Sequence, residues 1–544
     1  MKAAELLVRC LENENVEFIF GLPGEENLDV MDALLDSGIR FIGVRHEQGG
    51  AFMADVYGRL SGKAGVCLST LGPGATNLLT GVADANMDGA PVVAITGQAS
   101  LDRMHKESHQ HIDVVETFRP VTKWNAQVKT GRIIPEMVRK AFKVAQTEKP
   151  GATHIDFPED LAGEESAGAP LLVQFPPRPE PQAEELDHAA RLISAARSPI
   201  ILAGNGVVRQ DAGAALTRFA EKLNIPVAET FMGKGTVRDD HPLSLLTCGL
   251  QARDYVSCGF DRADVVIAVG YDLVEYAPER WNPECDKTIV HIDQLPAEVD
   301  QHYIVGVGVL GDISMALDHI AERAQPCQAD GYVQGLRRVI VQERDRFPDD
   351  TAFPMKPQRV LSDLRAVLGS ADIVVSDVGA HKMWVSRLFP CYQPNTCIIS
   401  NGFASMGIGV PGALAAKLLY PERNVVTVTG DGGFLMNSQE LETAVREQVA
   451  FVTLVFHDKS YSLIGMKQQG KFGRTSHINF GNPDFVQYAQ SFGAAGYRVE
   501  AAGELQPILR DALACGRPAV IDCPVDYTEN LRMMEHLGHL ICPI

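Results

Sequence analysis

Two aspartates that follow apolar runs are the residues best suited to chemistry in this chain. Asp431 lies within Gly430-Asp431-Gly432 at the end of the run 425–429, and Asp458 comes 27 residues later, after the run 451–456. If both runs are parallel strands, their carboxyl ends share one edge of a sheet, where ligands of α/β proteins bind. Glycines beside Asp431 would let a diphosphate approach the backbone, and carboxylate oxygens suit Mg²⁺, which usually bridges protein and phosphate. The pair predicts a metal and diphosphate site, whereas a lone strand–Asp–Gly turn would indicate only a turn.

The elements that must position these residues alternate along the chain in three blocks. Repeated strand–helix alternation predicts an α/β fold with a doubly wound parallel sheet in each block. A linker with five prolines should be extended and exposed, and a polar segment with one helix precedes the last block. We place the blocks at 1–163, 186–325 and 357–544, with the linker at 164–185 and the connecting segment at 326–356. Strands are expected at 18–20, 41–44, 65–69, 92–96, 199–203, 265–269, 288–292, 425–429 and 451–456, and helices at 49–59, 75–85 and 440–448.

Composition excludes several classes of protein. A chain of 544 residues, 45% of them apolar, is too long for one core and predicts two to four domains. The formal net charge of −20 argues against nucleic acid or an anionic membrane as the partner. No stretch approaches the ~20 apolar residues of a membrane span, and the N-terminus lacks a signal-peptide cleavage pattern. Eleven cysteines without a Cys-x-x-Cys pair favour reduced thiols over disulfides or a zinc site, so we expect a cytoplasmic protein.

Two glycine-rich turns have competing interpretations. Gly204-Asn205-Gly206 follows an apolar run, but Arg209 replaces the third glycine of a dinucleotide fingerprint, which favours a structural turn. The segment 72–77 reads as a strand-to-helix turn in which Thr76 or Asn77 could cap the helix, and it would either be purely structural or border a ligand.

The spacing of the two aspartates resembles the signature of the thiamine diphosphate enzymes. That signature is Gly-Asp-Gly followed, roughly two dozen residues later, by Asn or Asp, and it implies a glutamate at a strand end far upstream. The run 41–44 leads into Arg45-His46-Glu47, which matches, although Glu47 alone would be interpreted as a surface carboxylate. In that family the glutamate hydrogen-bonds the aminopyrimidine ring, which then removes a proton from the thiazolium carbon. The resemblance implies thiamine diphosphate and Mg²⁺ as cofactors, and pyrimidine-binding, central and diphosphate-binding domains in that order.

Within this family, nearly the whole chain resembles the catabolic, FAD-independent acetolactate synthases. The central block lacks the Arg-Phe-Asp-Asp-Arg-Val-Thr-Gly run of the biosynthetic enzymes, so FAD is not expected. The resemblance implies that two pyruvates are condensed to 2-acetolactate and CO₂. Simple decarboxylases of the superfamily carry Glu six residues after the second metal ligand, whereas this chain has Ile464, which favours carboligation. The matching segments are 263–272, 275–276, 281–282, 377–387, 400–407, 458–461, 468–469, 474–476, 480–482 and 524–527.

The resemblance also implies residue roles. Asp431 and Asp458 would bind Mg²⁺ with their side chains, and Ser460 with its carbonyl. Met406 would wedge between the two cofactor rings, and the Ala404 carbonyl would accept from the cofactor's amino group. The other cofactor-binding positions are Gly379, His381, Gly430, Gly432, Gly433, Tyr461 and Leu463, and His381 with the backbone at 432 and 433 would hold the diphosphate.

Three further residues are candidates for catalysis beside Glu47. Gln110 matches the family's active-site glutamine. Lys467 stands where enzymes of known type have Gln or Trp, and it would either pair with the carboxylate of the acceptor or lie solvated on a helix. Glu25 follows Pro23-Gly24, where acetolactate synthases have Gly or Ala and pyruvate decarboxylases have Asp, so it brings an extra acid to the site.

The partners expected are a small 2-oxo acid and a second copy of the chain. Glu47 and Asp431 lie in different blocks, and in the family such residues meet across subunits, which implies a homodimer or homotetramer with shared sites. No regulatory subunit is evident. The alternatives are a decarboxylase or carboligase acting on another 2-oxo acid or aldehyde acceptor, an FAD-dependent oxidase, and a silent regulatory subunit. The intact set of Glu47, Asp431 and Asp458 argues against the silent subunit.

Overall fold

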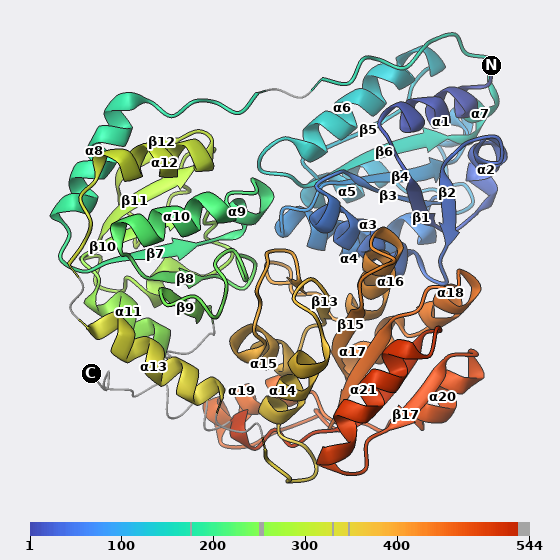
Figure 1. Ribbon diagram of the computed structural model, residues 1–544. Helices are drawn as coiled ribbons and strands as arrows, with labels where there is room; N and C mark the ends of the chain where they lie inside the picture. The colour runs from blue at the N-terminus through green and yellow to red at the C-terminus, as the bar shows by residue number, and fades with distance from the viewer. Residues whose placement is uncertain (175–176, 250–254, 329–330, 346–348, 531–544) are drawn as a thin grey trace.

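Three six-stranded sheets, one in each block, form the framework of the molecule (Figure 1). The computed structural model describes residues 1–544 except 175–176, 250–254, 329–330, 346–348 and 531–544. Every strand pairing recorded within the three sheets is parallel. The central strands β3, β4, β7 and β10 are buried along their whole length. This burial is why they appear in the sequence as unbroken apolar runs and not as alternating patterns. The predicted fold class is confirmed.

The first sheet has the strand order β2-β1-β3-β4-β6-β5. The helix after β2 begins at Glu47, two residues before the predicted start, because the side chain of His46 accepts a hydrogen bond from the Gln48 N–H and caps the helix. The elements are α1 (Ala3–Asn13), β1 (Phe18–Gly21), α2 (Leu28–Leu34), β2 (Arg40–Gly43), α3 (Glu47–Ser61), β3 (Gly65–Ser69), α4 (Pro73–Met87), β4 (Val92–Gln98), α5 (Val114–Phe118), β5 (Trp124–Gln127), α6 (Ile134–Gln146), β6 (Ala152–Pro158) and α7 (Glu159–Gly163).

The third sheet repeats this arrangement with the order β14-β13-β15-β16-β18-β17. If the strands of each block are numbered in chain order, the first and third sheets have the same strand order. The elements are α14 (Pro357–Val367), β13 (Ile373–Ser376), α15 (Ala380–Leu388), β14 (Cys397–Ile399), α16 (Gly409–Leu419), β15 (Val425–Gly430), α17 (Asp431–Asn437), α18 (Glu440–Arg446), β16 (Val452–His457), α19 (Ser462–Phe472), α20 (Phe485–Ser491), β17 (Ala495–Arg498), α21 (Leu505–Ala514) and β18 (Ala519–Pro524).

The central sheet differs, with the order β12-β11-β10-β7-β8-β9. This is the order of dinucleotide-binding folds, but its first glycine turn is filled by protein, because a Cβ on Gly204 would lie 2.4 Å from the Gly270 carbonyl oxygen. The elements are α8 (Ala183–Ala195), β7 (Pro199–Ala203), α9 (Asn205–Arg209), α10 (Gly213–Leu223), β8 (Val227–Glu229), β9 (Ser244–Thr247), α11 (Tyr255–Arg262), β10 (Val265–Val269), β11 (Thr288–Asp293), β12 (Val305–Leu310) and α12 (Ile313–Arg323), followed by α13 (Tyr332–Arg344) in the connecting segment.

The segments between blocks are as irregular as the prolines suggest. Residues 164–182 form no helix in their described part, and α13 is the one helix described between 326 and 356. Figure 1 shows the first linker running across the top of the molecule between the first and central blocks. The exact block boundaries remain a prediction.

The first and third blocks share one apolar core and a buried charge cluster. A single cluster of buried side chains includes Phe52 and Val56 of α3 together with Ala413 of α16. Beside it, the Arg59 guanidinium pairs with three buried carboxylates. These are Asp55 at 2.7 Å, Asp84 at 3.0 Å and Asp88 at 2.8 Å.

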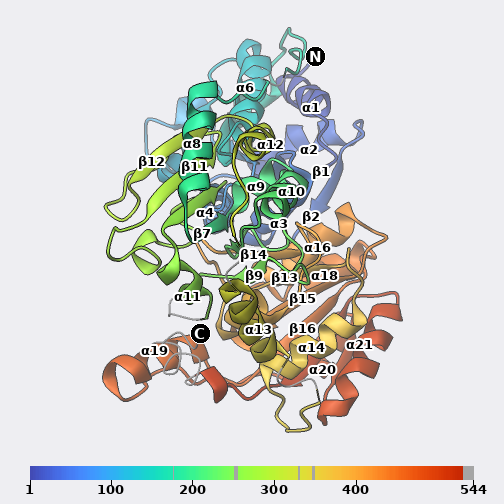
Figure 2. The ribbon, with the colours of Figure 1, turned by 60° about the vertical axis from the view of Figure 1, so that its left-hand side comes forward.

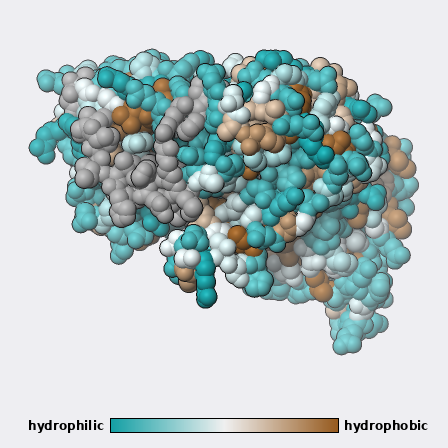
Figure 3. Space-filling model, turned by 90° about the horizontal axis from the view of Figure 1, so that it is seen from below, coloured by the Kyte–Doolittle hydropathy of each residue, from teal (hydrophilic) through white to brown (hydrophobic). Residues whose placement is uncertain are grey.

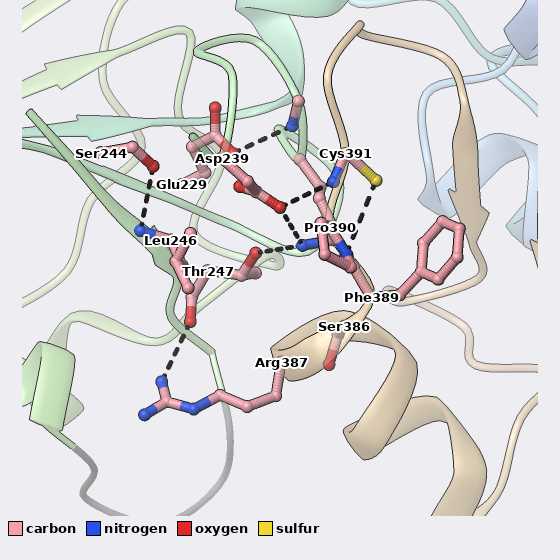
Figure 4. A network of polar contacts seen from close by, with 12 residues as sticks. Glu229, Asp239, Ser244, Leu246, Thr247, Ser386, Arg387, Phe389, Pro390 and Cys391 are labelled. Atoms are coloured by element: carbon pink, nitrogen blue, oxygen red, sulfur yellow. Dashed lines mark hydrogen bonds and ion pairs between the residues drawn. The ribbon is translucent and has the colours of Figure 1, made fainter. Parts of the chain in front are cut away.

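A second buried polar network joins the central block to the third (Figure 4). The backbone N–H of Asp239 donates to the Cys391 carbonyl at 2.9 Å, and the Asp239 carboxylate accepts from the Cys391 N–H at 2.8 Å. The Lys234 ammonium neutralises Asp239 at 3.2 Å. Burial, with the charge of Asp239, raises the pKa of the neighbouring Glu229 to about 8. Because Cys391 lies just beyond α15, the central block fixes the end of that helix.

On the face seen from below, hydrophilic residues cover most of the coloured surface (Figure 3). In the view from below, hydrophobic residues form separate groups among hydrophilic ones (Figure 3). Among the described residues, no helix is both long and apolar enough to cross a membrane. Of the ten cysteines in the described part of the chain, nine form no disulfide, whereas Cys258 is disulfide-bonded. The expectation of reduced thiols throughout is therefore wrong at Cys258, because pairing cannot be inferred from the spacing of cysteines.

Candidate active site

Asp431 and Asp458 meet at the carboxyl edge of the third sheet, as their spacing predicts. Strands β15 and β16 are adjacent and parallel, with Gly430 paired to Phe456. Asp431 begins α17 and is 1% exposed, and Asp458 follows the last residue of β16.

The Asp431 carboxylate is anchored by N–H groups on both oxygens. Its Oδ1 accepts from the Gly432 N–H at 2.9 Å. Its Oδ2 accepts from the Lys459 N–H at 2.7 Å, from the Asn482 amide at 2.8 Å and from the Asp458 N–H at 3.3 Å. These hydrogen bonds fix the Asp431 side chain in place. Asn482 lies in the segment 480–482, which resembles the acetolactate synthases, but the sequence alone did not identify it as a site residue.

Asp458 lies beside this charge in a partly desolvated position. Burial raises the pKa of Asp458 to about 6, and the Asp431 charge adds to the shift, against the hydrogen bond donated by the Ser462 hydroxyl. The next residues turn sharply, with Lys459 at φ +59°, and Ser460 pairs with Asn479 in an antiparallel bridge. Two adjacent carboxylates repel each other, so the site gains from a cation between them.

Next to Asp431, a buried histidine and three glycines form a cradle with little room for side chains. Burial lowers the pKa of His381 to about 4, and its Nε2 is buried without a hydrogen-bond partner in the described part of the chain. A Cβ on Gly430 would come within 3.2 Å of the His381 ring. A Cβ on Gly432 would lie 2.8 Å from the Tyr461 ring, and one on Gly433 would lie 2.8 Å from Asp377. An imidazole nitrogen without a protein partner among the described residues, next to glycine backbone, fits an oxygen-rich group such as a diphosphate.

The segment that carries Ala404 and Met406 is held by carboxylates from two blocks. Asp88 accepts from the Gly402 N–H at 2.5 Å, and Asp84 accepts from the Ser400 hydroxyl at 2.7 Å. Asp377 accepts from the Gly407 N–H at 3.0 Å. Ala404 has a left-handed backbone (φ +56°), and Met406 is half-buried. The strained backbone at Ala404 is maintained by these fixed neighbours.

Glu47 lies at the corresponding edge of the first sheet. It is the first residue of α3 and is 6% exposed. One carboxylate oxygen accepts from the Asn77 amide at 2.9 Å, and the other lies 3.3 Å from the position a Cβ would occupy on Gly74. The prediction that Thr76 or Asn77 caps α4 is wrong, because the cap is Gly72 and Asn77 lies inside the helix with its side chain directed to Glu47.

Gln110 and Glu25 lie on the same edge but differ in how they are held. Gln110 is exposed with φ +56°, and its backbone packs against Gly72. Glu25 is exposed at the start of a short 3-10 helix. Its neighbour Glu26 is the buried acid and accepts from the Thr70 hydroxyl at 2.5 Å.

Tyr461, Leu463 and Lys467 belong to the start of α19, which extends away from the body of the third block (Figure 2). The Tyr461 ring packs 4.8 Å from Phe480. Leu463 is half-buried, Lys467 is exposed, and Ile464 is 50% exposed.

The predicted residues therefore form two groups within one chain. The metal and cradle residues gather on the third sheet, whereas Glu47 and Gln110 gather on the first. Among the described residues, no hydrogen bond or ion pair is recorded between Glu47 and either Asp431 or Asp458.

Comparison with known proteins identifies the same three parts. Models of the thiamine pyrophosphate enzyme match residues 1–117 as the N-terminal TPP binding domain, 186–320 as the central domain and 377–523 as the C-terminal TPP binding domain.

Curated relatives match along nearly the whole chain. An acetolactate synthase of Bacillus subtilis is 38% identical over 98% of this chain and 94% of its own length. A catabolic acetolactate synthase of Raoultella terrigena is 37% identical over 98% and 97%. A probable acetolactate synthase large subunit of Methanocaldococcus jannaschii is 37% identical over 99% and 94%.

Proposed function

The chain belongs to the thiamine pyrophosphate enzymes, among the acetolactate synthases, and on this premise we propose how its residues divide the work of condensing two pyruvates to 2-acetolactate and CO₂. The group on the third sheet holds the diphosphate and a Mg²⁺ ion, and the group on the first sheet activates the ring. The observation that carries this division is the placement around one glycine cradle of Asp431, Asp458 and the His381 Nε2, which has no hydrogen-bond partner among the described residues.

The metal site consists of Asp431, Asp458 and the carbonyl of Ser460. No group of three or more His, Cys, Asp or Glu side chains that could hold a metal occurs in the described part of the chain. In Mg²⁺ sites the protein typically supplies only one or two carboxylates, and phosphate oxygens and water occupy the other coordination positions. Burial raises the pKa of Asp458, and the neighbouring Asp431 charge adds to the shift. A cation at this position would stabilise the ionised pair, which supports this assignment.

His381 and the backbone at 432 and 433 hold the diphosphate. A neutral imidazole donates one hydrogen bond and does not compete with the metal for the phosphate charge. Gly379, Gly430 and Tyr461 complete the cradle, and the Tyr461 ring closes it beside Gly432.

Glu47 shares a proton with a ring nitrogen of the cofactor. When bound, the cofactor supplies the electron sink for decarboxylation and for the new carbon–carbon bond. Asn77 orients Glu47 through one oxygen and leaves the other, beside Gly74, for the ring. Ala404 would offer its carbonyl to the cofactor's amino group, and Met406 would pack against the cofactor's rings.

Carboligation follows from what surrounds the second pyruvate. Leu463 and Ile464 offer no proton at the start of α19, which would disfavour release of an aldehyde and favour carboligation. Lys467 lies one turn beyond Leu463 and pairs with the acceptor's carboxylate. Gln110 and Glu25 border the pocket from the first sheet.

Two chains form each site in a homodimer, the unit of any larger homotetramer. The separation of the two groups within one chain supports this arrangement. Three large apolar side chains near the third-sheet group, Phe403, Met436 and Ile464, are 44–50% exposed and would be covered by a second copy.

We assign the enzyme to the FAD-independent, catabolic type in the cytoplasm, without a regulatory subunit. The missing FAD-type run in the central block and the similarity to the Raoultella enzyme support the assignment of type.

Hybrid oligomers test the shared site. Chains carrying Glu47→Gln and chains carrying Asp431→Ala should each be inactive alone, and co-expressed hybrids should recover activity because one of their two sites regains both residues. Hybrids of Asp431→Ala with Asp458→Ala provide the control, since both changes damage the same half and no complete site forms. Verified Glu47→Gln/Asp431→Ala hybrids without activity would refute the shared site.

A further inference from the structure

The turn that presents Glu47 is held by a buried glutamate of the third block. Glu440, the first residue of α18, is fully buried. Its Oε1 accepts from the backbone N–H groups of Arg45 and His46 at 3.1 Å each, and its Oε2 accepts from Arg45 N–H at 3.1 Å and the Thr443 hydroxyl at 2.6 Å. These N–H groups precede Glu47 directly and have no strand partner. Hydrogen bonds to a buried carboxylate are stronger than those between neutral groups.

The rest of the turn is fixed by neighbours of Glu440. At the far end of α18, the Arg446 guanidinium donates to the Gly43 carbonyl. At the end of α17, the Asn437 amide donates to the Gln48 side chain at 3.3 Å. A Cβ on Gly49 would lie 2.8 Å from Glu440 Oε1, so the helix start approaches the carboxylate as closely as a residue without a side chain allows. Figure 1 shows α18 next to β2, which is an edge strand of the first sheet.

The residues directly before and after Glu47 are therefore both held by the segment that follows Asp431 in the sequence. This segment runs from α17, which begins at Asp431, through Asn437 to Glu440. All these contacts lie within one chain.

We propose that Glu440 is a positioning residue for Glu47, and that it connects the metal half of one active site to the activating carboxylate of the neighbouring site. The second part rests on the proposed shared site, in which Glu47 serves the site whose Asp431 belongs to the other chain. Glu440 touches neither substrate nor cofactor in this account. It acts by fixing the backbone from which the Glu47 side chain reaches the ring.

The experiment places Glu440→Gln on one chain of a hybrid at a time. In the hybrid described above, the working site takes Glu47 from the Asp431→Ala chain and Asp431 from the Glu47→Gln chain. Adding Glu440→Gln to the Asp431→Ala chain should lower kcat by about tenfold or more, because misplaced catalytic groups lose rate steeply. Proton–deuterium exchange at the thiazolium carbon should slow in parallel, with KM for pyruvate little changed. Adding it to the Glu47→Gln chain should leave both rates within about twofold.

Other outcomes contradict the proposal in recognisable ways. An equal loss on either chain would mean that Glu440 only stabilises the fold, and a loss confined to the Glu47→Gln chain would place its action on the metal half. No loss on either chain would also overturn the proposal. An inactive parent hybrid would instead refute the shared site. In that case Glu440→Gln in the otherwise unaltered enzyme still tests whether Glu440 positions Glu47. The measurement is proton–deuterium exchange at the thiazolium carbon at saturating cofactor.

Glu229→Gln is the matched control. Glu229 is also a fully buried glutamate that accepts two backbone N–H groups, from Gly235 at 2.9 Å and Val237 at 2.6 Å, and a threonine hydroxyl, from Thr236 at 2.8 Å. It lies in the central block and makes none of the hydrogen bonds recorded for Glu47, Asp431 or Asp458. Its substitution should change activity equally on the two chains, whatever its effect on folding. Thermal unfolding of each variant reports whether the chains are folded.

Discussion

Glu47 and Asp431 are both carboxylates at strand ends, but the chain surrounds them differently. Asp431 accepts hydrogen bonds from four N–H donors, which fix its side chain in one position. Glu47 accepts one, from Asn77, and its second oxygen faces a glycine. The first environment suits a metal anchor, and the second suits a group that must share a proton.

Glu47→Gln should therefore abolish turnover while leaving cofactor affinity within about tenfold. Loss of an acid–base group of this kind costs roughly 10²–10⁴-fold in rate. Proton–deuterium exchange at the thiazolium carbon is the measurement. Exchange at the rate of the unaltered enzyme would remove Glu47 from this role.

Asp431→Ala should eliminate Mg²⁺-dependent cofactor binding, because the diphosphate loses its bridge to the protein. Calorimetric titration with thiamine diphosphate and Mg²⁺ measures the effect. Asp484→Ala is the control, since Asp484 also accepts N–H groups at a helix start, at α20, but lies outside the site. Normal affinity in Asp431→Ala would contradict the metal assignment.

Lys467→Gln should weaken the use of a second pyruvate and leave the first, decarboxylating step nearly intact. A charge-assisted hydrogen bond to the acceptor's carboxylate is worth roughly 1.5–3 kcal/mol, or about ten- to a hundredfold in acceptor use. Acetaldehyde should rise at the expense of acetolactate when products are quantified. Lys471→Gln, one turn further along α19, should leave the ratio unchanged. If both products of Lys467→Gln fall together, Lys467 does not select the acceptor.

At the scale of elements, the segment 400–407 depends on a close approach between blocks. A Cβ on Gly402 would lie 2.6 Å from both Asp88 Oδ1 and Met87 Cγ. Asp88 cannot easily retreat, because Arg59 holds it at 2.8 Å. Gly402→Ala should cost about 1–3 kcal/mol in unfolding free energy and weaken cofactor binding, because the strain falls on the segment that carries Ala404 and Met406. Gly503→Ala, where a Cβ meets nothing within 4 Å, is the control. Equal melting temperatures for the two variants would show that the segment tolerates displacement.

Sequence reasoning succeeded where elements are local. The buried strands β15 and β16 could be predicted from their apolar runs, and their parallel pairing placed Asp431 beside Asp458. Contacts between distant segments could not be predicted. Nothing near Asn77 in the sequence indicates Glu47 as its partner, and Glu440 lies almost 400 residues from the turn it holds. The sequence singled out Glu25 as the acid after Pro23-Gly24, but Glu26 is the buried one, because one residue of helical rotation decides which side chain turns inward.

At the scale of the whole molecule, two blocks of identical strand order carry the two halves of the chemistry. The shared core and the Arg59 cluster keep the blocks of one chain together. In the proposed mechanism, the segment from Asp431 to Glu440 makes that junction part of the catalytic apparatus. In the proposed dimer each chain gives one half to each site, so the sites depend on each other mechanically.

The central claim is that the enzyme joins two pyruvates and does not simply decarboxylate one. The direct test is the stoichiometry of products when the purified enzyme is incubated with pyruvate, thiamine diphosphate and Mg²⁺. Two pyruvates consumed for each CO₂ and each 2-acetolactate formed is the expected result, with no reaction when thiamine diphosphate is omitted. One CO₂ and one acetaldehyde for each pyruvate would contradict the claim.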